Sequence, residues 1–255
     1  MKIASWNVNS VKARLPNLVR WLEETAPDIA CLQELKCVDE AFPREDIEAL
    51  GYNVETHGQK TYNGVALLSK YPLEDVSRGL PRFEDEQARY IEAVISSNGS
   101  ALRVASLYLP NGNPVTQESG DAFHEKYSYK LDWMAALEAH AKTLLSFEEA
   151  FVLAGDYNVI PTRADCHAPD KWEGDALYRR SLYTYWRRII GPTLFFDVAK
   201  RQVHLAGAGG REALQRQAQD LEIRRQAGAA EQLDTDLDRA APALMLVGLG
   251  SQHIG

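Results

Sequence analysis

Polar side chains that could bind a phosphate or a metal ion directly follow an apolar run late in the sequence. The run "FVLAG" ends at Gly155, and Asp156 and Asn158 come next, two positions apart. Because side chains alternate along a strand, Asp156 and Asn158 would face the same way if the extended chain continues through Tyr157. Gly155 would let a ligand or a neighbouring backbone approach closely. This pair is the strongest single indication of a site.

The same pattern recurs at other expected strand ends. Asn7 lies in "SWNVN", Glu34 ends "CLQE", and Tyr108 ends "SLY", with Asn111 and Asn113 in the loop beyond. In layered α/β domains ligands bind beyond the strand ends, so we expect these groups to meet at one edge. Each also has an ordinary structural explanation: a turn residue for asparagine, a solvated loop acid for Glu34 and a core residue for Tyr108. Their joint occurrence favours a site.

These groups offer oxygen and amide ligands without a His/Cys cluster, a set that suits a hard cation. We expect Mg²⁺, with Mn²⁺ as the alternative ion, and Glu34 as its ligand. Such an ion polarises a phosphoryl oxygen. Asp156 would then position or activate the attacking water, while Asn7, Asn158 and Tyr108 hydrogen-bond the phosphate oxygens. The residues therefore predict phosphodiester cleavage.

A single α/β domain is expected to position these groups. Apolar runs predict strands at "KIASWNV", "DIACLQE", "YNVET", "GVALLSK", "YIEAVIS", "ALRVASLYL" and "FVLAG". An apolar stripe from Leu15 to Leu22, the segment "PREDIEAL" and a long segment from about Asp121 to Leu145 predict helices. Asn98-Gly99 is a strong hairpin signal, so part of the sheet is expected to be antiparallel.

Composition restricts the class of protein. The chain has 255 residues, 45% of them hydrophobic, enough to bury a core. Its formal net charge of −8 argues against a protein that coats nucleic acid by bulk attraction, but a nuclease needs only a few local Lys and Arg. No apolar run approaches the roughly 20 residues of a membrane span. Three cysteines without metal-site spacing predict reduced thiols, and we expect a cytoplasmic protein with no membrane contact.

The last part of the chain has a different composition. Every aromatic residue lies at or before Phe196, and residues 197–255 are rich in Ala, Gln, Arg and Gly. We therefore predict a body over residues 1–196 and an atypical tail over 197–255 that packs poorly. The best helical stripe of this tail lies around Arg211 to Gln226.

The quoted segments resemble a known family. With "MKIASWNVNSVKARL", "PDIACLQELKC", "YNGVALLSK", "SLYLPNGNP" and "LAGDYNVIPTRADC", residues 1–178 resemble the exonuclease III family of abasic-site endonucleases. The resemblance implies an α/β four-layered sandwich of two mixed β-sheets flanked by helices, the deoxyribonuclease I-like fold. It also implies a monomer that carries out Mg²⁺-dependent hydrolysis of double-stranded DNA. Such enzymes incise 5′ to abasic sites and remove nucleotides or blocking groups from 3′ ends.

Site residues follow from the resemblance, motif by motif. Asn7 in "WNVNS" and Glu34 in "LQE" are similar to the metal-site pair. Tyr108 resembles the tyrosine that contacts phosphate. Asp156 and Asn158 in "GDYN" resemble the acid that activates water and its phosphate-binding neighbour.

The resemblance also implies contacts to the DNA backbone. Arg89 in "EQARYIEA", Asn111 in "YLPNGN", and Lys126 and Lys130 in "HEKYSYKLDWM" are the expected DNA-binding residues. A lysine on an exposed helix face is more often merely solvated.

Two expected motifs are absent. Family members continue with a segment of the type Arg-Ile-Asp-His and finish with Ser-Asp-His, whose imidazole faces the scissile phosphate. Neither His204 nor His253 follows an aspartate, and the acidic "LDTDLDRA" fits no matching motif. We therefore expect a fold that is incomplete at its C-terminus, with strands missing from the second sheet, and an impaired nuclease. One hypothesis is a frameshift between about Asp175 and Asp197.

Two other functions remain open. The same catalytic core could serve a superfamily phosphoesterase that acts on a non-DNA substrate such as an inositol phosphate or sphingomyelin. Alternatively, the chain could be a catalytically dead DNA-binding protein or a misfolded product. The "YLPNGNP" and "LQELKC" segments favour the DNA-repair branch.

Overall fold

The computed structural model describes residues 1–97, 99–117, 122–147, 150–160, 163 and 168–179. Beyond these it describes the backbone of four short strands, at 194–197, 202–205, 222–223 and 244–248. Asn98 and Asp121 lie outside the described residues, as does His253. The side chain of His204 also lies outside them.

The first sheet brings the N-terminal strands together. It contains β1 (Lys2–Asn7), β2 (Ile29–Gln33), β3 (Asn53–His57), β4 (Val65–Ser69) and β11 (Glu222–Ile223), in the order β11-β1-β2-β4-β3. β1 and β2 run parallel, whereas β4 pairs antiparallel with both β2 and β3. β2 and β4 are buried along their whole length, as expected of their continuous apolar sequences.

The second sheet is also mixed. It contains β5 (Glu74–Arg78), β6 (Tyr90–Ser97), β7 (Ser100–Tyr108), β8 (Phe151–Asp156), β9 (Leu194–Asp197), β10 (Gln202–Leu205) and β12 (Leu244–Gly248), in the order β10-β9-β12-β8-β7-β6-β5. β6 and β7 form the antiparallel hairpin that the Asn98-Gly99 signal predicts, and β7 runs parallel to β8.

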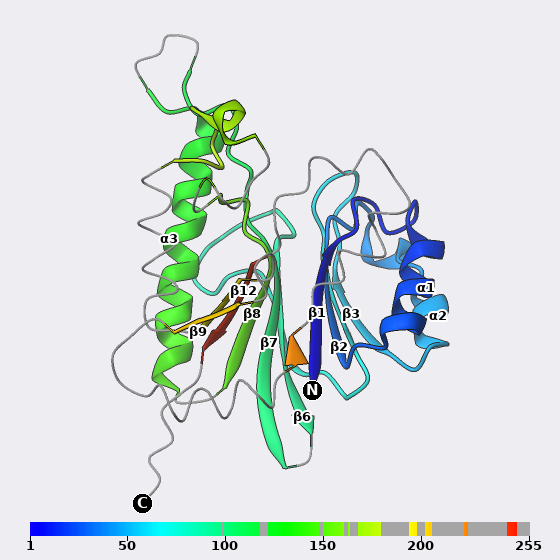
Figure 1. The fold of residues 1–255 in the computed structure, drawn as a ribbon. Coiled ribbons are helices and arrows are strands. Elements are labelled where there is room, and N and C mark those ends of the chain that lie inside the picture. The colour runs from blue at the N-terminus through cyan, green and yellow to red at the C-terminus, as the bar shows by residue number, and fades with distance from the viewer. Residues whose placement is uncertain are drawn as a thin grey trace, which may run out of the picture.

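Helices cover the outer face of each sheet. α1 (Leu15–Thr25), the 3₁₀ turn η1 (Asp39–Ala41) and α2 (Arg44–Glu48) lie against the first sheet, and α3 (Glu125–Ser146) lies along the second (Figure 1). A further 3₁₀ turn, η3 (Pro169–Trp172), lies beside the start of α3. The four-layered order of helices, sheet, sheet and helix confirms the predicted fold class. No described helix combines the length and the apolar character that a bilayer crossing requires.

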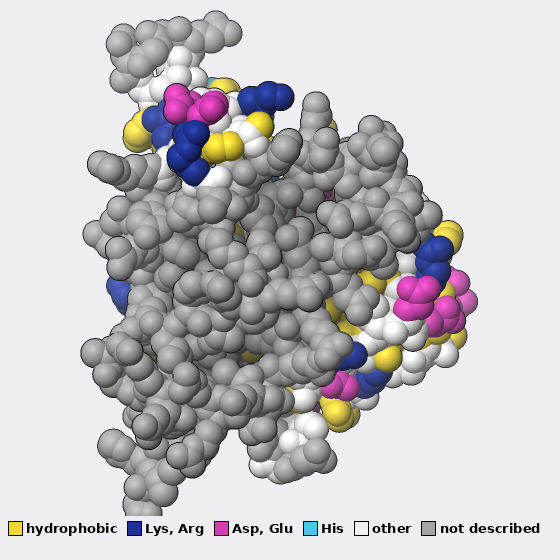
Figure 2. Space-filling model, viewed as in Figure 1, with side chains coloured by type: hydrophobic (Ala, Val, Ile, Leu, Met, Phe, Trp, Pro, Cys, Tyr) yellow, Lys and Arg dark blue, Asp and Glu magenta, His cyan; other side chains and the backbone are white. Residues whose placement is uncertain are grey.

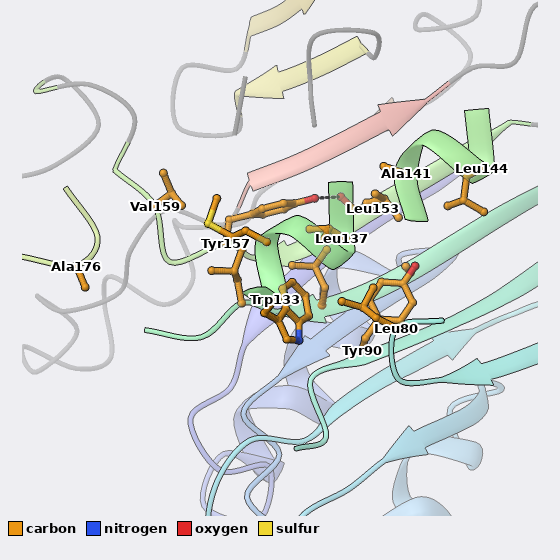
Figure 3. Packing of buried hydrophobic residues seen from close by; sticks show 14 of the residues in the cluster. Leu80, Tyr90, Trp133, Leu137, Ala141, Leu144, Leu153, Tyr157, Val159 and Ala176 are labelled. Carbon is orange, nitrogen blue, oxygen red and sulfur yellow. Dashed lines mark hydrogen bonds between the residues drawn. The ribbon is translucent and has the colours of Figure 1, made fainter. Parts of the chain in front are cut away.

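Three apolar clusters fill the spaces between these layers. One lies between α3 and the second sheet, where Trp133 and Leu137 meet Tyr90 and Leu153 (Figure 3). A second joins the two sheets face to face and includes Ile3, Ile29, Val65, Leu67, Ile91, Ile95, Val104 and Val152. The third lies beneath α1 and α2. The sheets are therefore fixed rigidly against each other, and their strand ends have a defined relative position.

The C-terminal part of the chain differs from two expectations. We expected a helix around Arg211–Gln226, but Glu222 and Ile223 pair with β1 as a short parallel strand, so the expectation is wrong there; the rest of that segment lies outside the described residues. We also expected missing strands in the second sheet. β12 pairs antiparallel with β8, and β9 and β10 extend the sheet beyond it.

Candidate active site

Two pairs of parallel strands bring the predicted residues to one edge of the sandwich. Asn7 ends β1 and Glu34 follows β2, its parallel neighbour in the first sheet. Tyr108 ends β7 and lies opposite Asp156, which ends β8 in the second sheet. Because parallel strands end at the same sheet edge, all four side chains converge where the two sheets meet.

Asn7 connects the two sheets through one amide group. Its Nδ2 donates to Glu34 Oε1 at 2.8 Å and to Asp156 Oδ2 at 3.0 Å. Its Oδ1 accepts a hydrogen bond from the backbone N–H of Asn9 at 3.1 Å. The Asn7 amide therefore holds two carboxylates close together, with its donor side facing both.

Glu34 is a partly exposed carboxylate surrounded by donors. Its side chain is 19% exposed, and Oε2 lies 2.9 Å from Lys36 Nζ. Burial alone would raise its pKa, but hydrogen bonds from Asn7, Lys36 and Tyr108 outweigh this effect and hold the pKa below its ordinary value. Glu34 is therefore ionised across the physiological pH range.

Asp156 has the opposite tendency. It is only 6% exposed, and burial raises its pKa, even though hydrogen bonds from the Asn158 backbone and from Asn7 favour the charged form. The nearby Glu34 carboxylate raises the pKa further. Because a carboxylate with a raised pKa binds a proton more readily, Asp156 is suited to accept one.

Asn158 is placed by a turn rather than by a continued strand. Its φ is 46°, in the left-handed region, and its backbone N–H donates to Asp156 Oδ1 at 3.0 Å. Asn158 Nδ2 donates to the carbonyl of Leu109 at 2.8 Å. The condition of an extended chain through Tyr157 is therefore not met, because β8 ends at Asp156 and Asn158 has a left-handed backbone conformation. Asn158 nevertheless remains beside Asp156.

Tyr108 and Arg89 form a second layer of contacts. Burial, together with the Glu34 and Asp156 carboxylates, raises the pKa of Tyr108, so its phenol stays protonated and can donate. The Arg89 guanidinium carbon lies 4.9 Å from the centre of the Tyr108 ring, and Arg89 Nη1 donates to the Tyr108 carbonyl at 3.2 Å. Arg89 therefore lies next to the site, as a contact to a substrate phosphate requires.

The other predicted DNA contacts divide into two kinds. Asn111 and Lys126 are exposed and remain candidates. Lys130 is fully buried, and its ammonium donates to three backbone carbonyls. The predicted DNA contact at Lys130 is wrong, because a buried ammonium with all three donors in use cannot reach a phosphate.

The site offers a limited set of ligands for a divalent ion. The described residues contain no cluster of three or more His, Cys, Asp or Glu side chains placed to chelate one. Mg²⁺ needs only one or two carboxylates because it keeps several waters, so Glu34 fits as a ligand. Asn7 does not fit the predicted ligand role as placed, because it turns its donor side toward the carboxylates.

Lys36 belongs to this site but was not among the predicted residues. Besides Glu34, its ammonium contacts Asn9 Oδ1. The available signal was its position in "LQELKC", two residues after Glu34 at a strand end. Its positive charge stabilises the ionised form of Glu34.

Positive and negative side chains lie side by side on the described surface over η3 and over the helices of the first sheet. Figure 2 shows Lys and Arg beside Asp and Glu in both places.

Comparison with known proteins identifies relatives along most of the chain. Residues 4–227 match the sequence profile of the Endonuclease/Exonuclease/phosphatase family. Exodeoxyribonuclease III of Haemophilus influenzae is 36% identical over 172 residues, which cover 67% of this chain and 62% of that protein. The match to a DNA repair nuclease of Danio rerio, at 30% identity, covers 66% of this chain and 52% of that protein. The chain thus spans between half and two thirds of the length of these relatives.

Solved structures show the same fold. A 3′ phosphatase from Neisseria bound to a product DNA hairpin is 28% identical, with a TM-score of 0.72 over 96% of this chain and 86% of that one. An abasic-site (AP) endonuclease from Archaeoglobus fulgidus is also 28% identical, with a TM-score of 0.71 over 98% of this chain and 99% of that one.

Proposed function

Because the chain belongs to the Endonuclease/Exonuclease/phosphatase family, we propose that it is a Mg²⁺-dependent DNA-repair phosphodiesterase of the exodeoxyribonuclease III type. Its substrates are double-stranded DNA with abasic sites, which it incises, and 3′ ends, from which it removes nucleotides. Relatives named as an exodeoxyribonuclease, an AP endonuclease and a 3′ phosphatase support this range. We also propose that the protein is a monomer and acts in the cytoplasm.

One observation carries it: two carboxylates with opposite pKa tendencies share one amide. Glu34, held ionised, would bind the divalent ion, whose chemistry is to polarise the phosphoryl oxygen and neutralise developing charge. Asp156, with its raised pKa, would take a proton from the attacking water. Asn7 fixes the spacing of the two groups.

The remaining residues would orient the DNA. Tyr108, protonated and beside both carboxylates, can donate to a phosphate oxygen. Arg89 and the exposed Asn111 and Lys126 supply donors or charge along the backbone. In the reaction the water oxygen bonds to phosphorus as the P–O3′ bond breaks. The products are a 3′ hydroxyl and a 5′ phosphate.

A duplex with one abasic site tests the proposal directly. We expect incision with Mg²⁺ and none with EDTA. Asp156→Asn should lower kcat by about 100-fold or more, because a positioned general base typically contributes that much. Glu34→Ala should also lower the rate and weaken Mg²⁺ binding measured by calorimetry.

Glu48→Gln is the matched control, since Glu48 is an exposed acid that pairs only with Arg44 among the contacts described. Parent rates in both Glu34→Ala and Asp156→Asn would refute the site. Hydrolysis of an inositol phosphate or sphingomyelin without DNA cleavage would favour the phosphoesterase alternative. DNA binding without turnover would favour a catalytically dead protein.

A further inference from the structure

Lys130 is a buried cation at the meeting point of three loops. It lies on α3 with 0% exposure, and Nζ donates to the carbonyls of Asn111 at 3.0 Å, Asn158 at 2.6 Å and Ala176 at 3.1 Å. An ammonium has three donors, so this set satisfies it completely. Each carbonyl belongs to a different segment: the loop after β7, the turn after β8 and the chain after η3.

Keeping a charge at this position is costly. Burial lowers the pKa of Lys130 to about 7, although the carboxylates of Asp156 and Asp175 act in the opposite direction. Many apolar side chains would fill the same volume without this desolvation cost. The three hydrogen bonds to carbonyl groups offset part of this cost, so the ammonium is held by its contacts with the loops.

The bond to Asn158 connects Lys130 to the proposed general base. Lys130 holds the Asn158 carbonyl, while the Asn158 N–H donates to Asp156 Oδ1 and its Nδ2 donates to the Leu109 carbonyl. Without Lys130, the backbone carbonyl of Asn158 would lose this hydrogen bond. The hydrogen bond on Asp156 would then lose its fixed direction.

The loop after β7 is fitted onto the aliphatic part of Lys130. A Cβ atom on Gly112, whose φ is +87°, would lie 2.6 Å from Lys130 Cδ and 3.3 Å from the Ala176 Cβ. Asn113 Nδ2 also donates to both carboxylate oxygens of Asp175, at 3.1 and 3.0 Å. The "NGN" loop and the chain after η3 are therefore joined both through Lys130 and beside it.

We propose that Lys130 is a positioning residue for the reaction, one that joins the three loops and so fixes Asn158 and Asn111 over the substrate. The inference rests on the proposed function for its effect on catalysis. The local ordering of the loops is independent of that function and can be measured without substrate.

Lys130→Met tests this role because it keeps the length of the side chain and removes every donor. We expect hydrogen exchange to increase in peptides covering residues 109–115, 156–160 and 174–178, and to stay unchanged over β4. In the abasic-site assay, kcat should fall by about 10- to 100-fold with little change in KM, as for a small misplacement of catalytic groups. Lys130→Arg keeps charge and donors and should recover part of both losses.

Lys142→Met is the matched control, an exposed lysine of the same helix that pairs with Glu138. It should change neither loop exchange nor kcat. If Lys130→Met does not fold, Gly112→Ala displaces the same contact from the other side and should produce the same local exchange pattern.

The outcomes separate the two proposals. Unchanged loop exchange in the folded variants, or an increase spread evenly over the chain, would overturn the positioning role. A local increase with no change in kcat would also overturn it. If the parent protein cleaves no DNA and the increase is still local, the proposed function fails while the ordering role stands.

Discussion

Glu34 and Asp156 show how two residues of similar chemistry acquire different roles from their surroundings. Glu34 has three donors directed at it, and its pKa is lowered. Asp156 is almost fully buried, and its pKa is raised. Paired carboxyl groups whose environments separate their pKa values can take opposite parts in one reaction. Here one stays charged and the other can bind a proton.

The raised pKa of Asp156 also predicts an effect on stability. The folded state binds this proton more tightly than the unfolded state does. The contribution of Asp156 to stability is therefore full below its unfolded pKa, about 3.9, and is lost as pH rises through the folded pKa. Asparagine does not titrate. Relative to the parent, Asp156→Asn should therefore become progressively more stable as the pH rises from about 4 through the folded-state pKa of Asp156.

Urea unfolding across that pH range would measure this difference in free energy of unfolding. Asp46→Asn, at an exposed acid of α2, controls for the general loss of a carboxylate. A difference for Asp156→Asn that is constant with pH, or that falls as pH rises, would contradict the expected linkage.

At this scale the sequence predicted which residues meet but not how each is held. Asn7, Glu34, Tyr108 and Asp156 converge as expected, because each marks the end of a recognisable strand. Lys130 was wrongly predicted to contact DNA, because its burial depends on three carbonyl groups from segments that are distant in the sequence. No local pattern reports contacts of that kind.

Gly155 determines how closely β7 and β8 can pair. A Cβ atom at this position would lie 1.9 Å from the carbonyl oxygen of Leu107, far inside van der Waals contact with backbone that cannot rotate away. The parallel register of these two strands is what brings Tyr108 opposite Asp156. The absence of a side chain at Gly155 therefore allows both the pairing of β7 with β8 and the position of Tyr108 opposite Asp156.

Gly155→Ala should destabilise the protein by about 3 kcal/mol or more, at the upper end of overpacking effects. Gly51→Ala is the control, because Gly51 also has a positive φ, +84°, but a Cβ there meets nothing within 4 Å. We expect the control to cost only about 1–2 kcal/mol of backbone strain. Urea denaturation of both variants checks this, and equal losses would contradict the close approach of the strands.

The sequence predicted β1–β4 and β6–β8, because apolar residues run through these strands or alternate along them, but it did not predict β9–β12. β5 was missed, since its sequence "EDVSR" has no apolar pattern and its residues are mostly exposed. It pairs with β6 at the outer edge of the second sheet, where hydrogen bonding rather than burial defines the strand. An edge strand of this kind depends on its neighbour more than on its own residues.

At the scale of the whole chain, the amino-acid composition changes after Phe196, the last aromatic residue. We propose that residues 1–196 form an incomplete Endonuclease/Exonuclease/phosphatase domain and that residues 197–255 are an atypical Ala/Gln/Arg-rich tail. The tail contributes short strands of two to five residues to the sheets. Its sequence contains neither the Arg-Ile-Asp-His nor the Ser-Asp-His segment that the family resemblance implies.

Abasic-site cleavage by the chain should accordingly be at least about 100-fold slower than by a version in which both segments have been restored, since positioned acid/base groups contribute on that scale. Parallel measurements of kcat/KM on one duplex would show this. Grafting the same segments with His replaced by Ala is the control. Equal rates for parent and restored proteins would mean that another group supplies the missing imidazole. Sequencing of the locus would separately test the frameshift.

The site residues come from two consecutive parts of the chain, one for each sheet. β1 to β4 belong to the first sheet and β5 to β8 to the second, so the body passes between sheets at residues 70–73. Asn7 and Glu34 come before this crossing, and Tyr108 and Asp156 come after it. A polypeptide cut there would yield two fragments, each carrying a single member of the carboxylate pair. The architecture thus lends itself to fragment complementation, in which turnover would report the reassembly of the two halves.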